Sequence, residues 1–275
     1  MNKVFATILF LVLIPALTVQ AEQKKEITFV VHPFKSPSKL RSMFTPLLKH
    51  MEKKLGYKIV FRTGKSYEDV IDLYNDGTAD FGYLGPAGYV NAARKKLVKP
   101  LARIMYKGKG TFNGVIVVKN QSSISAISDL KDKSFAFGDK NSTLSHYVPH
   151  YMLLKENVPL SELSEYKFTG KHDNVAQGVL LGLFDAGGLK PAVANNYLDK
   201  GLRILATSEP ISEHLFVVNS KLDKKMADKI RQLLLKVKIS LLTPIKKGIT
   251  GIEPVKSSDY DNLRKIIDEV NKQEF

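Results

Sequence analysis

Two segments decide the fold: DFGYLGPAGYVN (residues 80–91) and DAGGLKPAVANN (residues 185–196), which share the pattern D-x-G-x-L-x-P-A-x-x-x-N. The match extends upstream at fixed offsets. A Gly lies three residues before each Asp, a Val ten residues before, and a ring residue, Tyr67 or His172, thirteen residues before. Several fixed offsets in one register favour an internal repeat over a chance match. The repeat predicts two lobes of like topology, whose equivalent helix N-termini face each other across a cleft.

Strand-like and helix-like patterns alternate around the repeat. Strand patterns cover 26–32, 57–63, 79–85, 114–120 and 134–139, and helical patterns cover 40–55, 66–75, the segment from 86 onward, 226–237 and 263–270. This alternation predicts an α/β protein with mostly parallel sheets flanked by helices. We expect lobe 1 to comprise 22–115 and 209–275, and lobe 2 to comprise 116–208, with hinge strands near 110–118 and 203–218.

The N-terminal segment MNKVFATILFLVLIPALTVQA (1–21) has the pattern of a secretory signal peptide. Lys3 precedes an apolar run over 4–17, and Val-Gln-Ala (19–21) places small residues at the cleavage site. A membrane anchor is the alternative, but the run is shorter than the about 20 apolar residues of a spanning helix. Glu22 follows and the sequence has no Cys. We therefore expect a soluble periplasmic protein without a lipoprotein anchor.

The composition is that of a folded chain with a strong positive charge. Hydrophobic residues make up 44% and charged residues 25%, and the formal net charge is +15. In an exported protein, this charge favours small anions or anionic lipid surfaces over nucleic acid. A lysine-rich solvated surface explains it equally well. Disulfides and thiol chemistry are excluded, because the sequence has no Cys.

A donor-rich run, GDKNSTLSHYVPHY (138–151), links a strand pattern to a segment that reads as a helix. Asn141, Ser142 and Thr143 stand where the helix would begin. A helix N-terminus exposes unpaired N–H groups and a partial positive charge, so it suits an oxyanion. The same residue types are also ordinary N-caps. Three of them in a row, with a second lobe opposite, favour anion binding.

The residues now show a family resemblance that covers nearly all of the chain after the signal peptide. GDKNSTLSHYVP (138–149), TGKHDNVAQGV (169–179), DFGYLGPAGYV (80–90) and MEKKLGYKI (51–59) resemble segments of the periplasmic substrate-binding proteins of phosphonate, phosphite and phosphate ABC importers. The resemblance implies a two-lobed type II periplasmic binding protein fold with two crossing hinge strands. It also implies a protein that closes on a small oxyanion and delivers it to a membrane permease with its ATPase.

The resemblance assigns roles to individual residues. Ser142 and Thr143 would hold phosphoryl oxygens through hydroxyl and backbone N–H groups, with Asn141 in the same loop, and His172 would donate to another oxygen. Tyr67 would reach over from the other lobe, and Tyr83 would line the same wall. Each has a plain structural alternative, namely a helix-start aromatic for Tyr67, a helix cap for His172 and a core residue for Tyr83.

Three departures from the family pattern concern the ligand. Leu144 replaces a third small hydroxyl residue, and Phe112 replaces a Tyr. Ala192 and His214 stand where aminoalkylphosphonate binders have the two carboxylates that hold the ligand ammonium. Lys190 either adds a positive charge near the site or is a solvated lysine at a helix start. These departures predict an oxyanion ligand without an amino group.

The residues suggest two other functions, a hydrolase and a free periplasmic sensor. Ser142, His172 and Asp185 are the residue types of a hydrolase triad, but the sequence has no G-x-S-x-G elbow. It also has no metal-ligand cluster, P-loop or dinucleotide-binding motif. We therefore expect no catalysis, cofactor or metal. We expect a monomer that does not bind nucleic acid. A free periplasmic sensor that signals through a membrane receptor remains the alternative to a transport role.

The signal-peptide interpretation is directly testable. The exported protein should begin near Glu22, because cleavage after Ala21 removes the apolar run, and osmotic shock should release it from the cells. Intact-mass measurement of the released protein checks this, and a mass that retains residues 1–21 would contradict it.

Overall fold

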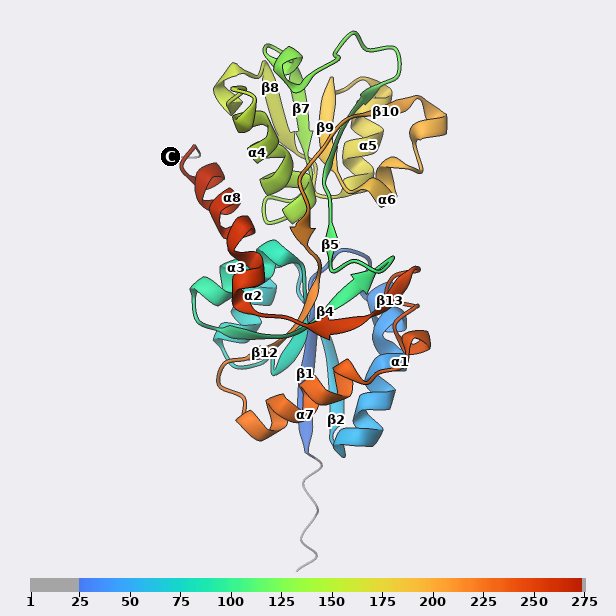
Figure 1. Ribbon diagram of the computed structural model, residues 1–275, viewed down its shortest axis with the longest axis vertical. Coiled ribbons are helices and arrows are strands. Elements are labelled where there is room, and N and C mark those ends of the chain that lie inside the picture. The colour runs from blue at the N-terminus through green and yellow to red at the C-terminus, as the bar shows by residue number, and fades with distance from the viewer. Residues whose placement is uncertain (1–24, 274–275) are drawn as a thin grey trace, which may run out of the picture.

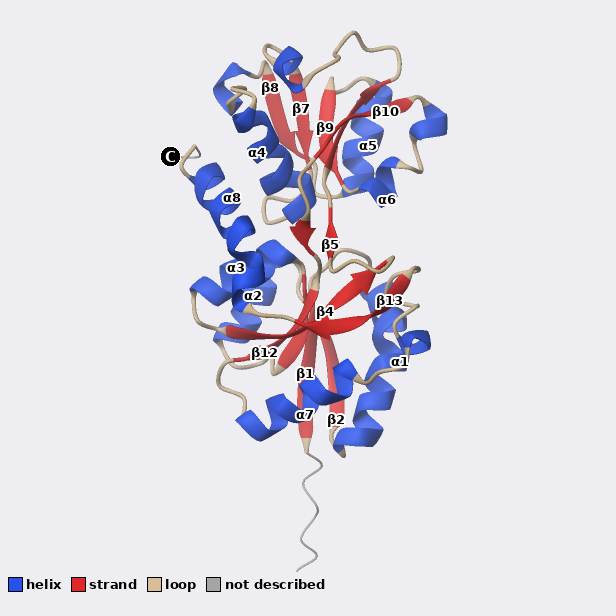
Figure 2. Cartoon of the chain, in the orientation of Figure 1, coloured by secondary structure: helices blue, strands red, loops and turns tan. Residues whose placement is uncertain are grey.

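The computed structural model describes residues 25–273, so the predicted signal peptide (1–21) lies outside the described residues. The described chain forms two lobes, stacked one above the other in Figure 1, and each lobe is a sheet with helices on both faces. Figure 2 shows the same division by secondary structure. The α/β class and the two-lobed architecture are therefore as predicted.

Lobe 1 is built on a six-stranded sheet in the order β13-β4-β12-β3-β1-β2. Apolar clusters cover both of its faces, one with α1 and α7 and the other with α2, α3 and α8. The elements of this lobe are β1 (Glu26–Val31), α1 (Pro37–Leu55), β2 (Lys58–Thr63), α2 (Tyr67–Asn75), β3 (Phe81–Leu84), α3 (Pro86–Arg94), β4 (Val98–Tyr106), β12 (Leu215–Asn219), α7 (Lys224–Leu235), β13 (Ile249–Pro254) and α8 (Asp261–Asn271).

Lobe 2 has a five-stranded sheet in the order β10-β6-β9-β7-β8. This order matches β4-β12-β3-β1-β2 of lobe 1 strand for strand, as the internal repeat predicts. Its elements are β6 (Val115–Lys119), β7 (Ser134–Phe137), α4 (Val148–Lys155), β8 (Glu165–Phe168), α5 (His172–Leu181), β9 (Ala186–Leu189), α6 (Pro191–Ala194) and β10 (Leu202–Thr207).

Two short strands join the lobes. β5 (Thr111–Phe112) and β11 (Ile211–Ser212) pair antiparallel and lie between the two large sheets (Figure 1). Both fall inside the ranges predicted for hinge strands. The chain enters lobe 2 through β5 and continues directly into β6. It returns through β11 and continues directly into β12.

The sheets are mixed, whereas the sequence predicted mostly parallel ones. β1 runs parallel to β2 and β3, but β12 runs antiparallel to β3 and β4. β6 is likewise antiparallel to β9 and β10. The hinge explains the difference. The chain comes from the hinge into β6 and β12 on the side where the parallel strands have their carboxyl ends, so both strands run in the opposite direction.

The helix boundaries follow local signals in the sequence. α1 stops at Gly56, whose φ of 75° lies in the left-handed region that favours glycine. Ser66 caps α2, and its side chain accepts a hydrogen bond from the N–H of Asp69. The donor-rich run differs from the continuous helix that the sequence predicts, since Thr143–Tyr147 forms a π-helical turn before α4 begins.

The repeated Asp residues have the same structural role in both lobes. The Oδ2 atom of Asp80 accepts a hydrogen bond from the backbone N–H of Thr28 at 2.7 Å, and that of Asp185 accepts from Ser134 at 2.8 Å. Each Asp thus joins the start of its strand to the neighbouring parallel strand. This role accounts for Asp185 without a catalytic function.

Apolar side chains also connect the lobes. Leu144 and Val148 of lobe 2 pack in one cluster with Leu84, Ile211 and Leu263 of lobe 1 and the hinge. Helix α8 contacts α4 of the other lobe (Figure 1). Among residues 25–273, no helix combines the length and apolar character needed to cross a bilayer.

The Gly of the repeat permits close packing of a helix on a strand. A Cβ atom on Gly82 would lie 2.1 Å from the carbonyl oxygen of Val30 and 2.3 Å from the hydroxyl of Tyr74 in α2. A Cβ atom on Gly187 would lie 2.5 Å from the Cγ1 atom of Val175 in α5. In both lobes, neighbouring atoms already occupy the space that a Cβ atom on this glycine would need.

Replacement of this glycine should destabilise the protein. We expect Gly82→Ala to lower the free energy of unfolding by about 1–3 kcal/mol through overpacking, and the melting temperature by roughly 2–4 °C per kcal/mol. Gly88→Ala is the matched control, because a Cβ atom on Gly88 would have no heavy atom within 4 Å. Thermal unfolding of both variants checks this, and equal melting temperatures would contradict it.

Candidate functional site

Two histidines, a lysine and a glycine lie where strands of the two lobes end or begin. His32 follows β1, Gly85 follows β3, Lys190 follows β9, and His214 lies between β11 and β12. Ligands of open α/β sheets bind outside the carboxyl ends of the parallel strands. We call the region where these ends of the two lobes meet the interlobe site.

His32 is a member of this site that the sequence analysis missed. Its side chain is buried, and its ring centroid lies 5.1 Å from that of Tyr67 and 5.5 Å from that of His214. The available signal was its position, since it directly follows the first predicted strand. A histidine at the carboxyl end of a strand is a candidate for that reason alone.

His214 is surrounded by rings. It stacks on Tyr83 with centroids 5.5 Å apart and an interplanar angle of 15°, and Phe112 meets its edge at 5.4 Å. The structure therefore brings the predicted residues Tyr83, Phe112 and His214 together. Burial raises the pKa of Tyr83, so its hydroxyl stays protonated.

Groups of the opposite lobe act electrostatically on both Tyr67 and His172, the two ring positions of the repeat. Both are the first residues of their helices, α2 and α5. Burial raises the pKa of Tyr67, and Asp139 of lobe 2 raises it further. The pKa of His172 is lowered to about 3 by burial, with additional effects of Lys190 and of His214 and Lys35 from lobe 1.

Thr143 makes a direct hydrogen bond between the lobes. Its Oγ1 atom accepts from the backbone N–H of Ala87, in the first turn of α3, at 2.9 Å. Ser142 caps its own helical turn, with its Oγ atom accepting from the N–H of Ser145 at 3.3 Å. Asn141 lies in the same loop, where its N–H donates to Asp139. The ordinary capping function of Ser142 is thus present, and its hydroxyl hydrogen remains able to donate.

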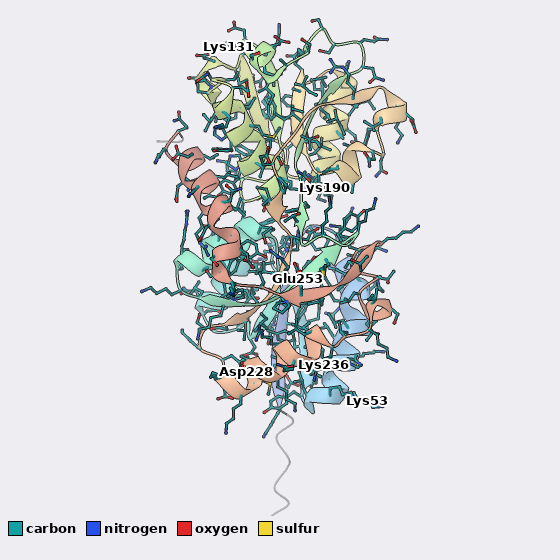
Figure 3. The ribbon with its side chains drawn as sticks, in the orientation of Figure 1. Lys53, Lys131, Lys190, Asp228, Lys236 and Glu253 are labelled. Atoms are coloured by element: carbon teal, nitrogen blue, oxygen red, sulfur yellow. The ribbon has the colours of Figure 1, made fainter. Side chains whose placement is uncertain are left out.

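Lys190 brings a cation to the site. It is half-buried at the start of α6 and lies at the level where the lobes meet (Figure 3). Its backbone N–H donates to the Nδ1 atom of His172 at 3.2 Å. Burial lowers the pKa of its ammonium, and Lys35 and Lys246 lower it further. No ion pair of the described residues involves Lys190.

Hydrogen-bond partners define the state of the three histidines. The Nδ1 atom of His32 donates to the carbonyl of Tyr83 at 3.3 Å, because a carbonyl oxygen only accepts. The Nδ1 atom of His214 donates in the same way to the carboxylate of Glu213 at 2.6 Å. Burial lowers the pKa of His32 to about 3 and also lowers that of His214. As neutral rings, His32 and His214 present acceptor Nε2 atoms, and His172 presents an Nε2–H donor.

Glu213 holds this side of the site in place. Its side chain is fully buried, and its carboxylate binds Lys246 at 2.5 Å in addition to His214. Burial alone would raise its pKa, but the hydrogen bonds from these two partners and the ammonium charge of Lys246 lower it. Tyr260 donates to its backbone carbonyl at 2.8 Å.

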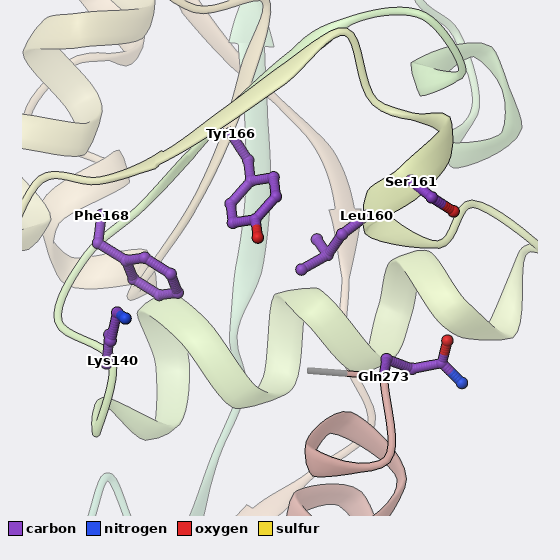
Figure 4. A pocket seen from close by; sticks show the side chains of 6 residues that line it. All are labelled: Lys140, Leu160, Ser161, Tyr166, Phe168 and Gln273. Carbon is purple, nitrogen blue, oxygen red and sulfur yellow. The ribbon is translucent and has the colours of Figure 1, made fainter. Parts of the chain in front are cut away.

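Leu144 and Ala192 lie apart from the polar groups of the interlobe site. Leu144 packs in the apolar cluster between the lobes, and Ala192 is exposed on α6. Among residues 25–273, no group of three or more metal-ligating side chains could hold a metal ion. A separate pocket lies between lobe 2 and the C-terminal end of the chain after α8 (Figure 4) and contains none of the predicted site residues; it is lined by Lys140, Leu160, Ser161, Tyr166, Phe168 and Gln273.

The chain is similar in sequence to two proteins named for phosphate import and for phosphonate binding. The chain is 27% identical over 273 residues to the phosphate-import protein PhnD of Mycolicibacterium smegmatis, covering 88% of this chain and 85% of that protein. It is 28% identical over 159 residues to the phosphonates-binding periplasmic protein of Escherichia coli, covering 56% of this chain and 47% of that protein.

A solved structure supports the fold. PhnD1 of Prochlorococcus marinus, in complex with methylphosphonate, superimposes with a TM-score of 0.79 at 22% identity, covering 90% of this chain and 99% of that one. The family model described as the periplasmic substrate-binding protein of a phosphonate ABC transporter matches residues 29–260. The chain therefore belongs to this family, whose members bind substrates for ABC transporters and are not enzymes.

Proposed function

We propose that this protein captures a small phosphorus oxyanion, a phosphonate, phosphite or phosphate, between its lobes and delivers it to an ABC permease with its ATPase. The observation that carries the proposal is the hydrogen bond between Thr143 of lobe 2 and the N-terminus of α3 in lobe 1, together with the ammonium of Lys190, which acts on His32 and His214. Helix N-termini from both lobes meet there. Their partial positive charges suit a tetrahedral anion.

The donors come from both lobes, so the ligand would hold the lobes together. Ser142 and Thr143 offer hydroxyls, with Asn141 in the same loop, and His172 offers its Nε2–H group. Tyr67 offers a hydroxyl from lobe 1. Oxyanion recognition needs donors with fixed directions, and the hydrogen bond from Lys190 to the Nδ1 atom of His172 fixes that ring.

The remaining residues would enclose the rest of the ligand. Tyr83 and Phe112 form an aromatic wall around His214. Leu144 contributes to the apolar boundary between the lobes. Small size and low polarity of the ligand's substituent are therefore favoured, as in an alkyl group or a hydrogen on phosphorus.

The charges favour a ligand without an amino group. Ala192 is exposed, and His214 is held as a neutral ring. The carboxylate of Glu213 is already bound to His214 and Lys246. A ligand ammonium would therefore find the carboxylate of Glu213 already paired and would be repelled by Lys190, at a desolvation cost of several kcal/mol.

Periplasmic location follows from the family, and we propose that the mature protein works there as a soluble monomer after removal of residues 1–21. The ligand would close the lobes, and the permease would recognise the closed form. Phosphorus oxyanions and an ABC permease with its ATPase are thus the partners of this proposal.

The hydroxyl of Thr143 should matter for affinity. A hydrogen bond to a charged group contributes about 1.5–3 kcal/mol, so Thr143→Val should weaken methylphosphonate binding by roughly 10- to 100-fold. Thr143→Ser keeps the hydroxyl and should bind nearly as the natural protein does. Calorimetric titration of both variants provides the measurement.

Ser161→Ala is the control for location, because Ser161 lines the separate pocket in Figure 4. Its affinity for methylphosphonate should be unchanged. Unchanged affinity in Thr143→Val, with a melting temperature showing that the variant is folded, would remove Thr143 from the proposed site.

Ligands with and without an amino group should differ in affinity. We expect methylphosphonate, phosphite or phosphate to bind more tightly than 2-aminoethylphosphonate, because Lys190 repels a second ammonium group. Calorimetry with the four ligands at one pH checks this. Tenfold tighter binding of 2-aminoethylphosphonate would show that an acid of the site, such as Asp173, accepts the amino group.

A further inference from the structure

We propose that the interlobe site binds its oxyanion as the singly protonated monoanion, with the one P–OH hydrogen of the ligand shared between the Nε2 atoms of His32 and His214. The inference rests on the proposed function and specifies the ionic form of the ligand. Its starting point is an asymmetry in the site. Hydroxyls, N–H groups and the ammonium of Lys190 can donate to a phosphoryl oxygen, but these two nitrogen atoms can only accept.

The acceptor character of both nitrogen atoms follows from their partners. The Nδ1–H of His32 is used by the carbonyl of Tyr83, and the Nδ1–H of His214 is used by Glu213. A neutral imidazole carries one N–H, so each Nε2 atom has a lone pair. Both Nε2 atoms lie 3.6 Å from the place where a Cβ atom on Gly85 would stand. The two acceptor atoms therefore lie close enough to contact the same ligand atom beside the N-terminus of α3.

Neutral rings are consistent with the surroundings. Burial is the largest cause that lowers the pKa of both histidines, and the ammonium of Lys190 lowers both further. Lys246 acts on His214 in the same direction, whereas Glu213 opposes it. A protonated ring would add a cation next to Lys190, so the lone pairs persist at neutral pH.

The fixed charges around the rings are already balanced. Three ammonium groups and three carboxylates act on the histidines and on Tyr67 and Lys190: Lys35, Lys190, Lys246, Asp139, Asp173 and Glu213. Lys35 approaches Asp173 at 4.0 Å, and Lys246 binds Glu213. A monoanion adds one negative charge beside Lys190, and a dianion adds two. Uncompensated charge in a buried site is costly, so the balance favours the monoanion.

Comparison with a sulfonate distinguishes the effect of the ligand proton on affinity from the effects of ligand shape and charge. Methanesulfonate has the shape and the single charge of hydrogen methylphosphonate, but it has no proton to donate. In its complex the two lone pairs would be buried without partners. A site built to pair a ligand hydrogen discriminates strongly against the analogue that lacks it.

Calorimetry with the natural protein at pH 6 tests this discrimination. We expect methanesulfonate to bind at least about tenfold more weakly than methylphosphonate, the consequence of leaving buried acceptors unpaired. Equal affinities would overturn the proposal and leave the proposed function intact. If neither methylphosphonate, phosphite nor phosphate binds, the proposed function itself fails.

The pH dependence gives an independent readout. Above the second pKa of the ligand, the apparent Kd should rise by about tenfold per pH unit, because the protonated fraction falls by that factor. The midpoint should follow the ligand when phosphite is compared with methylphosphonate. Lys190→Arg keeps the cation charged and should leave both midpoints in place. A midpoint that is the same for both ligands, or a Kd that falls with rising pH, would overturn the proposal.

Variants of His32 test the acceptor itself. His32→Phe removes the lone pair and should weaken methylphosphonate binding by at least about tenfold while leaving methanesulfonate binding unchanged or stronger. His32→Gln returns an acceptor oxygen and should restore part of the preference. His50→Phe, on α1, removes an imidazole outside the interlobe site and serves as the control. A His32→Phe protein that is folded and keeps the full preference for methylphosphonate would overturn the proposal.

Discussion

A buried carboxylate governs the geometry of the site. Glu213 follows hinge strand β11, and its side chain is fully buried, so it must be paired. It binds Lys246 on one oxygen and His214 on the other. The second contact orients the imidazole and places its hydrogen on Nδ1. Glu213 therefore ties the end of hinge strand β11 to the ring of His214.

The two lobes share a topology but contribute different chemistry. Tyr67 and His172 occupy equivalent places at the starts of α2 and α5. In the proposed site, lobe 1 would supply the accepting rings of His32 and His214 besides the hydroxyl of Tyr67, and lobe 2 would supply the donors of the 141–143 loop together with Lys190. A ligand with both oxygen acceptors and a hydrogen to donate satisfies both lobes. The two copies of the repeat differ at these few positions, while the structural Asp and Gly residues have the same roles in both.

Much of the fold could be predicted because its signals are local. Periodicity located the strands and helices, Gly56 and Ser66 marked helix ends, and the repeated pattern at Asp80 and Asp185 predicted two lobes of like topology. Local patterns carry no information on strand direction. For that reason the mixed sheets were missed, since β6 and β12 are antiparallel only because they enter from the hinge.

The sequence by itself determined the two lobes and the family resemblance, because these depend on residue type and spacing, and on the same basis it proposed the residues of the site. Only the tertiary structure decided which atoms face which. It shows that His32 lies in the site, that Leu144 packs in the apolar cluster, and that Thr143 accepts a hydrogen bond from the N-terminus of α3. It also fixed the tautomers, because the partner of an imidazole nitrogen is a carbonyl or carboxylate from another part of the chain, and only folding brings that partner within hydrogen-bonding distance.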